Sequence, residues 1–418
     1  MTDESFINKY KTKAKYFTRK PILNFKVLTL FIFYTIQRSI QRELDMFFKE
    51  VNGSKFSQRV VSQVAFSLAR HKIKPDVFVE LNNISVDYFY SNTNYKKWNG
   101  HRLIAIDGST AVVPNNKATR DFYKTYSTNL MDDNEIVLVR LSKAQDVLNK
   151  ITIDTYITPL SIGEHSLAKC HIENCWNNDL LLFDRGYPSF ELFTAVKNKG
   201  AQFCTRLAVS NWNVAKKLVE SQDNEITVEI KPSSHHKRKC KERGLDCKPI
   251  KCRFIKIELD SGEQEVLITS LTDQDAYPYD YFKELYHLRW YVEESFKKIK
   301  HVLLLENFSG KSPLAIQQDF YAKTLYENFT SILSFGINED IKKTRKKKTK
   351  YEYQINFINA FSRVKEFFVS LFYDTSIYEL VKLLRLRFLD EISPIRPDRK
   401  YFRKNSKRPK YYRNYLWM

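Results

Sequence analysis

The sequence predicts a mixed α/β protein in which helical regions precede and follow a sheet. Short apolar runs alternate with helical segments between residues 102 and 207, as expected for strands joined by helices. Further strand patterns follow at 225–270, while helical spacing dominates residues 21–81 and the chain after Tyr279. At 418 residues the chain can bury a sizeable core and is expected to hold more than one domain.

The N-terminal region is expected to be helical. Apolar residues recur at helical spacing from Pro21 to Phe48, and Pro21 suits a first helical turn. A second helical segment, Ser57 to His71, follows a turn, and Pro75 opens a third. Such short helices fit a small DNA-binding domain, and an ordinary helical cap on the next domain explains them equally well. The polar side chains available for DNA contacts are Gln58, Arg59, Gln63 and Arg70.

Two predicted strands end in a carboxylate. Arg102 to Asp107 and Asp179 to Asp184 are short apolar runs that stop at a turn. Both acids are therefore expected at the carboxyl edge of the sheet, where function gathers in open α/β sheets. Taken singly, Asp107 or Asp184 also fits the role of a turn former or helix cap. The other strand and helix candidates here are Glu135–Leu141, Ile151–Pro159, Glu164–Glu173, Ser189–Lys199 and Gln202–Leu207.

Residues 225–270 predict three strands with no helix between them. These strands are Ile226–Ile230, Ile250–Leu259 and Gln264–Ser270, with basic residues through 237–256. A zinc site is an alternative, because five candidate ligands gather here: His235, His236, Cys240, Cys247 and Cys252. The cysteine spacings lack the close pairs of structural zinc sites, so reduced thiols in a basic loop are favoured. The six cysteines of the chain show no disulfide framework.

The most informative stretch begins at Tyr286. On one continuous helix, four polar side chains would fall within about 60° of a single face. They are Tyr286, Arg289, Glu293 and Lys300. Glu294 falls about 100° away from Glu293, so Glu293 is the carboxylate that we expect to have a function. Taken alone, the strip fits a solvated ion-pair face as well, because Arg289 and Glu293 stand at i, i+4.

Asp107, Asp184 and Glu293 would together bring three carboxylates into one pocket. Like charges at that spacing are unstable without cations, and carboxylate oxygens prefer hard metals, so Mg²⁺ or Mn²⁺ is expected. Two such ions roughly 4 Å apart can activate an attacking oxygen and stabilise the leaving oxygen in phosphoryl transfer. Arg289 and Lys300 would then bind the flanking phosphates.

The charge of the chain points to a polyanionic partner. Lys and Arg number 69 against 48 acidic residues, a formal charge of +21, and nucleic acid is the commonest partner of such proteins. An anionic membrane is the competing partner. No membrane span is expected, because the longest apolar run, Val27 to Ile36, is too short to cross a bilayer. The N-terminus lacks the layout of a secretory signal, so we expect a cytoplasmic, nucleoid-associated protein.

Two basic runs have two interpretations each. Lys342 to Lys350 carries seven Lys or Arg, and residues 391–418 carry nine against two acidic residues. Such runs are usually solvated segments. In a protein that acts on DNA they also supply salt-dependent phosphate contacts.

These residues resemble the insertion sequence 4 family of bacterial DDE transposases. Asp107 in Ile-Asp-Gly-Ser-Thr and Asp184 in Phe-Asp-Arg-Gly-Tyr are similar to the two aspartates of that family. The family signature Y-x2-R-x3-E-x6-K is matched by Tyr286, Arg289, Glu293 and Lys300. Gly163–Ala168 is similar to the stretch between the aspartates, with His165 where Arg is more usual. The similarity covers roughly residues 20–330.

The resemblance implies a ribonuclease-H-like core, split by the β-rich insertion between the second Asp and the Glu. The implied domains are a helical DNA-binding region at 1–95, a catalytic core at 96–208 and 276–335, the insertion at 209–275 and a basic helical region and tail at 336–418.

The implied activity is cut-and-paste transposition. Metal-activated water nicks the transposon end, and the freed 3′-hydroxyl then attacks target DNA. Asp107, Asp184 and Glu293 would be catalytic residues and ligands of two Mg²⁺ or Mn²⁺ ions, while Tyr286, Arg289 and Lys300 would contact DNA phosphates. Double-stranded DNA, as inverted-repeat ends and as target, would be the substrate of a homodimer.

Two alternatives keep the same residues. A related nuclease or domesticated element would cut DNA without joining it. A DNA-binding protein with a decayed active site is the other alternative, and the intact motif positions argue against it. Some relatives flip a base onto an aromatic residue; Trp212, Tyr277 or Tyr279 fits that role, although packing is favoured for each. Trp290 and Tyr291 are expected in the core.

Overall fold

The computed structural model describes residues 1–19, 21–125, 136–259, 262–344 and 350–396. The chain forms two compact units that interleave along the sequence. Unit 1 contains the described residues of 1–92, 111–138 and 298–418, and unit 2 contains residues 93–110 and 139–297. The domain boundaries expected from the sequence stay predictions. Among the described residues, no helix combines the length and the apolar character needed to cross a bilayer.

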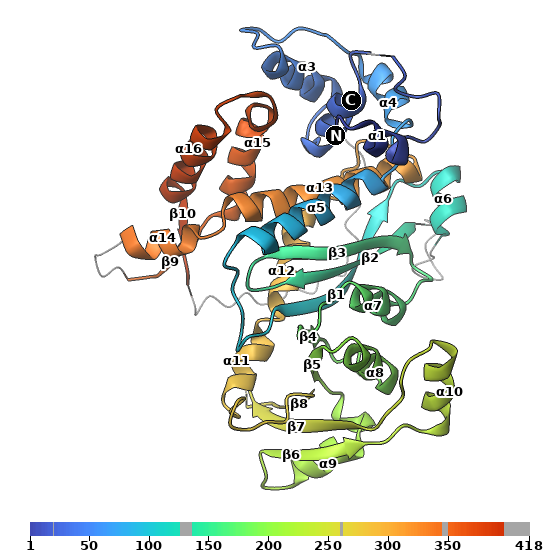
Figure 1. The fold of residues 1–418 in the computed structure, drawn as a ribbon, viewed down its shortest axis with the longest axis vertical. Coiled ribbons are helices and arrows are strands. Elements are labelled where there is room, and N and C mark those ends of the chain that lie inside the picture. Colours follow the sequence, from blue (N-terminus) through green and yellow to red (C-terminus); the bar gives the residue numbers. More distant parts are fainter. Residues whose placement is uncertain (20, 126–135, 260–261, 345–349, 397–418) are drawn as a thin grey trace. The chain divides into compact units, whose positions relative to one another are not determined.

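Unit 2 is built around a mixed sheet of eight strands (Figure 1). The strand order in this sheet is β3-β2-β1-β4-β5-β8-β7-β6. Its strands are β1 (Leu103–Val113), β2 (Val137–Asp146), β3 (Ile151–Pro159), β4 (Leu180–Phe183), β5 (Gln202–Arg206), β6 (Glu225–Ile230), β7 (Ile250–Glu258) and β8 (Gln264–Thr269). β4 pairs parallel with β1 and with β5, while β8 pairs antiparallel with β5. The mixed α/β sheet expected from the sequence is confirmed, and the strands of the insertion, β6 to β8, extend one end of that sheet.

Apolar side chains explain why β4 lies at the centre of the sheet. All four residues of β4 are buried, as expected for a parallel strand covered on both faces. The helices α7 (Glu164–Glu173) and α8 (Phe190–Asn198) pack on the sheet through buried residues of one core cluster. Within that cluster the rings of Phe193 and Phe203 stack with centroids 4.2 Å apart. The predicted helices and strands of this region are thus confirmed, with ends shifted by a few residues.

The insertion between β5 and α11 (Tyr281–His287) contains helices as well as strands. After the short 3₁₀ helix η1 (Val209–Asn211), α9 (Asn213–Glu220) precedes β6, and α10 (Ser234–Glu242) lies between β6 and β7. The expectation of strands with no helix between them was wrong. Ser233 and His236 form a capping box at the start of α10, and Cys240 is the buried residue of this helix. Because α10 is otherwise polar and basic, its sequence shows too little apolar periodicity to predict a helix.

Helices build most of unit 1. They are α1 (Glu4–Tyr10), α2 (Phe25–Phe33), α3 (Ile40–Val51), α4 (Gln63–Arg70), α5 (Asp76–Asn92), α6 (Lys117–Tyr123), α13 (Pro313–Leu333), α14 (Ile337–Thr344), α15 (Phe357–Tyr373) and α16 (Ile377–Asp390). The long helix α13 packs against α2, α5 and α15 and is buried along most of its length. Two three-residue strands, β9 (Tyr353–Ile355) and β10 (Ile392–Pro394), pair antiparallel. They were not expected, because three residues carry too short a pattern.

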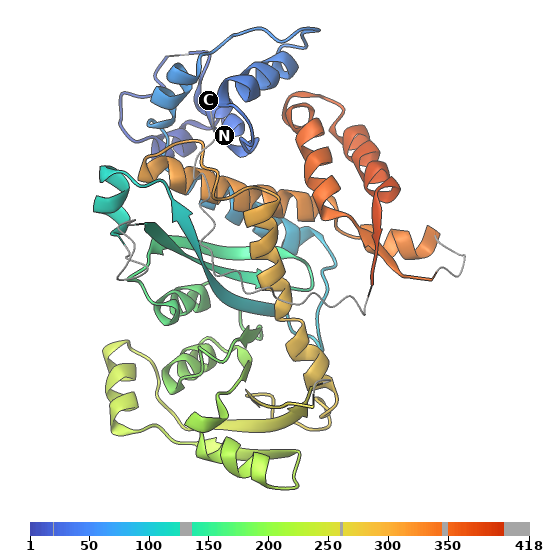
Figure 2. The ribbon, with the colours of Figure 1, turned by 180° about the vertical axis from the view of Figure 1, so that it is seen from behind.

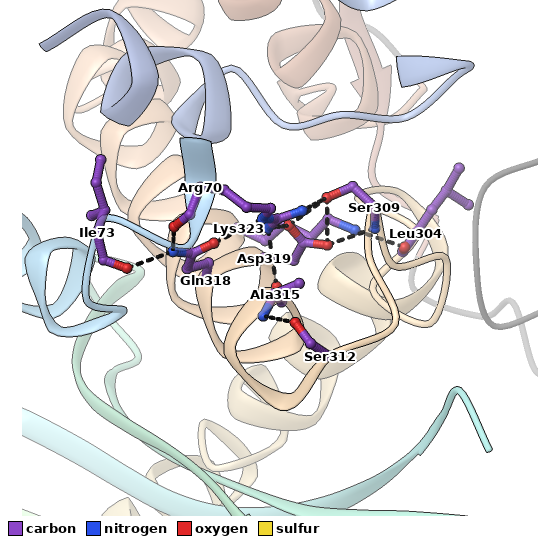
Figure 3. A network of polar contacts seen from close by, with 9 residues as sticks. All are labelled: Arg70, Ile73, Leu304, Ser309, Ser312, Ala315, Gln318, Asp319 and Lys323. Carbon is purple, nitrogen blue, oxygen red and sulfur yellow. Dashed lines mark hydrogen bonds and ion pairs between the residues drawn. The ribbon is translucent and has the colours of Figure 1, made fainter. Parts of the chain in front are cut away.

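A buried polar network joins α4 to α13 and to the chain that precedes α13 (Figure 3). The Arg70 guanidinium, 3% exposed, donates to Gln318, to Asp319, to the Ser309 hydroxyl and to the carbonyl oxygen of Ala315. Arg70 is therefore not available to DNA, and that part of the sequence interpretation was wrong. The basic runs fall partly outside the described residues, since 345–349 and 397–418 are not among them.

Candidate active site

Strand register places Asp107 and Asp184 at the same level on neighbouring parallel strands. Ala105 of β1 pairs with Leu182 of β4, and each aspartate stands two residues beyond that pair. Asp184 follows the end of β4, as expected, whereas β1 continues past Asp107 to Val113. The prediction that this strand stops at Asp107 was wrong. The Gly-Ser-Thr that follows has the composition of a turn but lies within the strand.

The helix that carries Glu293 begins after a break (Figure 2). α11 ends at His287, and α12 (Trp290–His301) starts three residues later, so the assumption of one continuous helix was wrong. At the break, the N–H of Arg289 bonds the Tyr286 carbonyl at 3.1 Å, and the Val292 N–H bonds the Arg289 carbonyl at 3.2 Å. These three-residue bonds tighten the chain in the manner of a 3₁₀ turn. The 60° strip computed for an unbroken helix therefore does not describe these side chains.

Three of the four predicted strip residues still gather around the aspartates. The Tyr286 hydroxyl donates to the carbonyl oxygen of Phe183 at 3.2 Å, directly before Asp184. The Arg289 guanidinium donates to Glu293 Oε1 at 2.8 Å and lies 3.9 Å from Asp107 Oδ2. Arg289 is 3% exposed, so it acts as a buried counter-charge for both acids.

Lys300, the fourth strip residue, belongs to unit 1. Burial lowers the pKa of its ammonium group, and the charge of Glu306 opposes that effect. Its predicted place beside the three acids stays a prediction.

The electrostatics of the site are those of crowded carboxylates. The pKa of Asp107 is raised to about 6, chiefly because burial penalises the charged form. The Gly108 N–H and the Arg289 guanidinium lower this pKa, while the charges of Glu293 and Asp184 raise it further. Asp107 therefore lies within the electric field of both other acids, and a cation at the site would favour its ionised form.

Arg206 is a site residue that the sequence interpretation missed. It ends β5, the next parallel strand after β4, and its guanidinium lies 3.3 Å from Asp184 Oδ1 while also pairing with Glu265. A basic residue at the carboxyl end of a third parallel strand is the signal that could have revealed it. Arg206 and Arg289 thus supply one guanidinium each to the acidic cluster.

The donor set fits a hard divalent cation in its chemistry. Within the described part of the chain, no three His, Cys, Asp or Glu side chains stand close enough to hold a metal ion as they are placed. The acids instead pair with Arg289 and Arg206. Three partly exposed carboxylates nevertheless offer the all-oxygen donors and the negative charge that Mg²⁺ or Mn²⁺ requires.

A pocket of about 530 Å³ opens beside these residues. Its lining combines three cationic side chains, three acidic side chains and three rings: Arg206, Lys283 and Arg289; Glu265, Asp280 and Glu284; Tyr286, His287 and Trp290. Trp290 and Tyr291 are 41% and 40% exposed, so the expectation that they lie in the core was wrong. Its arginines and lysine offer donors for phosphate groups, and the exposed Trp290 ring offers a flat surface of the kind on which a base stacks.

The other aromatic candidates make packing contacts, as favoured from the sequence. Trp212 packs against Phe254 with ring centroids 6.2 Å apart. The Tyr279 hydroxyl donates to the Lys256 carbonyl at 2.6 Å, and Tyr277 stacks on Trp98.

Comparison with known proteins places these residues in a family. A family model described as a transposase DDE domain matches residues 98–329. The transposase InsG for insertion sequence element IS4 of Escherichia coli K12 is 22% identical over 288 residues, which are 68% of this chain and 63% of that protein. The putative transposase InsZ of the same organism is 26% identical over 125 residues, 29% of this chain and 41% of that protein. The chain thus spans less than two thirds of either relative.

A solved structure of the piggyBac transposase synaptic complex with hairpin DNA also aligns with the chain. The alignment covers 92% of this chain and 82% of that one, at 9% identity and a TM-score of 0.45.

Proposed function

Because the chain belongs to the transposase DDE domain family and is similar to transposases of insertion sequence 4, we propose that it catalyses cut-and-paste DNA transposition by metal-dependent phosphoryl transfer. Water would attack the phosphate at the transposon end and release a 3′-hydroxyl. That hydroxyl would then attack a phosphate of target DNA and release a 3′-oxygen there. The observation that carries the proposal is the meeting of Asp107, Asp184 and Glu293 in one electrostatic cluster, at the positions that match the family motif.

We assign the three acids as ligands of two Mg²⁺ or Mn²⁺ ions, which when bound would activate the attacking oxygen and stabilise the leaving one. The side chains around them hold the acids in place. The Tyr286 hydroxyl ties α11 to the end of β4, beside Asp184. The Arg289 guanidinium fixes the Glu293 carboxylate and offsets the charge of Asp107. Arg289 also lines the pocket, and with the charge of the acids offset by bound ions its guanidinium is proposed to bind phosphate.

Double-stranded DNA is the proposed substrate, as inverted-repeat ends and as target. The net charge of +21 and the three cationic side chains in the lining of the pocket support this substrate. Tyr286, Arg289 and Lys300 are proposed as phosphate contacts, and the fact that Tyr286 and Arg289 line the pocket supports two of the three. A homodimer that joins two ends, acting in the cytoplasm on nucleoid DNA, completes the proposal.

The test is Mg²⁺-dependent nicking of a duplex that carries the inverted repeat of the encoding element. Glu293→Gln should abolish nicking and leave DNA binding near the wild-type level, because only one carboxylate oxygen is replaced. Glu294→Gln is the matched control, since Glu294 is the exposed neighbour of Glu293 on the same helix. Nicking by Glu293→Gln at the wild-type rate would remove Glu293 from the mechanism.

The alternative of a nuclease that cuts without joining is separated by a second substrate. A pre-nicked end with a free 3′-hydroxyl is mixed with supercoiled plasmid, and joined products are counted. A transposase joins the end to the plasmid in the presence of Mg²⁺, whereas the nuclease alternative yields no joined product.

A further inference from the structure

The first turn of α7 contacts the backbone beside both aspartates. An ideal Cβ placed on Gly108 would lie 2.8 Å from the carboxyl carbon of Glu164, closer than real Cβ atoms come to other atoms. The imidazole Nε2 of His165, the next residue, lies 2.8 Å from the carbonyl oxygen of Gly186 and donates to it. Successive helical residues point about 100° apart, so one turn can reach two different segments of chain.

The contact with Gly108 bears directly on Asp107. The Gly108 N–H donates to Asp107 Oδ1 at 2.9 Å, so the position of this peptide helps to orient the carboxylate. Glu164 is held in turn by an ion pair with Arg140 of β2. The Glu164 carboxyl group therefore occupies the space that a side chain at residue 108 would need, and its ion pair with Arg140 limits how far it can move aside.

The contact with Gly186 bears on Asp184 in the same way. Gly186 lies in the turn that the Tyr187 N–H closes by bonding the Asp184 carbonyl at 3.0 Å. The ring of His165 packs against the ring of Tyr187. The Tyr187 ring packs in turn against the ring of Phe183, the residue that precedes Asp184 in the sequence. His165 therefore holds the turn that follows the second aspartate.

α7 itself is firmly anchored to the sheet. Leu167, Ala168 and Ile172 are buried in the core of unit 2. The imidazole of His171 bonds the Ser142 hydroxyl on β2 and the Asp154 carboxylate on β3, both at 2.9 Å. A helix tied to two strands can transmit a fixed position to whatever its first turn contacts.

We propose that the first turn of α7 is a positioning element for the two catalytic aspartates, in which Glu164 sets the place of Asp107 through Gly108 and His165 sets the turn after Asp184 through Gly186. The proposal rests on the function proposed above. Neither side chain is a catalytic residue, since each acts through a backbone contact. The competing interpretation is that Glu164 and Arg140 form an ordinary half-exposed ion pair with no bearing on the site.

The sharpest test is a pair of substitutions that conflict and then compensate. Gly108→Ala should reduce Mg²⁺-dependent nicking by about 10- to 100-fold, because its methyl group must displace Glu164 or the Asp107 segment. Adding Glu164→Asp shortens the opposing side chain by one methylene and should restore at least about a third of the lost rate. Gly163→Ala is the matched control, since nothing lies within 4 Å of a Cβ at Gly163.

A second arm tests each side chain separately. Glu164→Ala should slow nicking at saturating DNA and leave the Kd for DNA unchanged, whereas Glu173→Ala, at the exposed end of α7, should change neither. His165→Gln keeps an N–H donor and should retain more activity than His165→Ala. Equal loss in both His165 variants would overturn the role of the hydrogen bond to Gly186.

The readouts separate this proposal from the proposed function. Mn²⁺ binding, measured by calorimetry without DNA, should weaken by about 10- to 100-fold in Gly108→Ala and recover with Glu164→Asp. Wild-type nicking together with full activity of Gly108→Ala would overturn the positioning element and leave the function standing. Absence of wild-type nicking, with the Mn²⁺ effects intact, would overturn the function and leave the positioning element. No recovery of either readout in the double variant would overturn the contact between Gly108 and Glu164 as the cause.

Discussion

Replacement of Arg70 by methionine should destabilise the protein strongly and leave its affinity for DNA unchanged. Methionine keeps much of the length of the side chain but removes the guanidinium, which makes four hydrogen bonds in the network of Figure 3. Its partner Asp319 is 6% exposed and would remain as a buried carboxylate without its counter-charge. Loss of one partner from a buried ion pair costs about 3–5 kcal/mol.

That cost can be converted into a denaturant midpoint. With a slope of about 2–3 kcal/mol per molar urea, a loss of about 3–5 kcal/mol lowers the unfolding midpoint by about 1–2.5 M. The free energy of unfolding of wild type and Arg70→Met is measured by urea titration followed by circular dichroism. Arg59→Met is the matched control, because Arg59 is exposed on the same N-terminal segment and its loss should leave the midpoint unchanged.

For DNA affinity, in contrast to stability, replacement of Arg59 is expected to have the larger effect and replacement of Arg70 the smaller one. If Arg59 lies on the predicted DNA-binding surface, Arg59→Met weakens binding in proportion to one lost phosphate contact, and folded Arg70→Met binds as the wild type does. A double-mutant cycle with Asp319→Asn should give a coupling energy of about 1–3 kcal/mol. A midpoint for Arg70→Met equal to that of Arg59→Met would refute the burial argument.

Two further predictions concern Lys323, which is buried, and Arg206, which is partly exposed. Burial lowers the pKa of Lys323 to about 8, so between pH 8 and 10.5 the unfolded state binds more protons than the folded state. The free energy of unfolding of the wild type, relative to that of Lys323→Met, should therefore rise with pH between pH 8 and 10.5 and stay constant below pH 8. Urea titrations that give the same difference between the two proteins across pH 7–10.5 would contradict this. Arg206→Met should reduce Mg²⁺-dependent nicking by about 10- to 100-fold, because Asp184 loses the guanidinium beside it. Lys199→Met, a surface control, should nick normally, and equal rates for the two variants would exclude Arg206 from the site.

Local sequence patterns predicted the elements that local forces decide. β4 and β5 are short apolar runs between turns, and α7 and α8 carry apolar residues at helical spacing. Burial of these apolar residues favours the same strands and helices that their spacing predicts. The residue types and spacing of the motif also sufficed to identify the family, because phosphoryl transfer of this kind needs carboxylates that converge on metal ions.

Residues whose role depends on distant partners were misjudged. Arg70 has the charge of a DNA-contacting residue, yet Asp319 and Gln318 of α13 bury it. The break between α11 and α12 was missed, because nothing between Tyr286 and Val292 is a helix breaker and the tight turn appears only in the hydrogen bonds. Arg206 was passed over, since its meaning comes from β5 lying beside β4.

The sequence by itself determined which side chains could do the chemistry, because the type of each side chain and the apolar pattern around it are local properties. Only the tertiary structure decided how those side chains are held: Arg289 between Asp107 and Glu293, and Glu164 against Gly108. The physical reason is that counter-charge and close packing act through space over a few ångströms, and in the chain Arg289 and Asp107, like Glu164 and Gly108, are more than fifty positions apart.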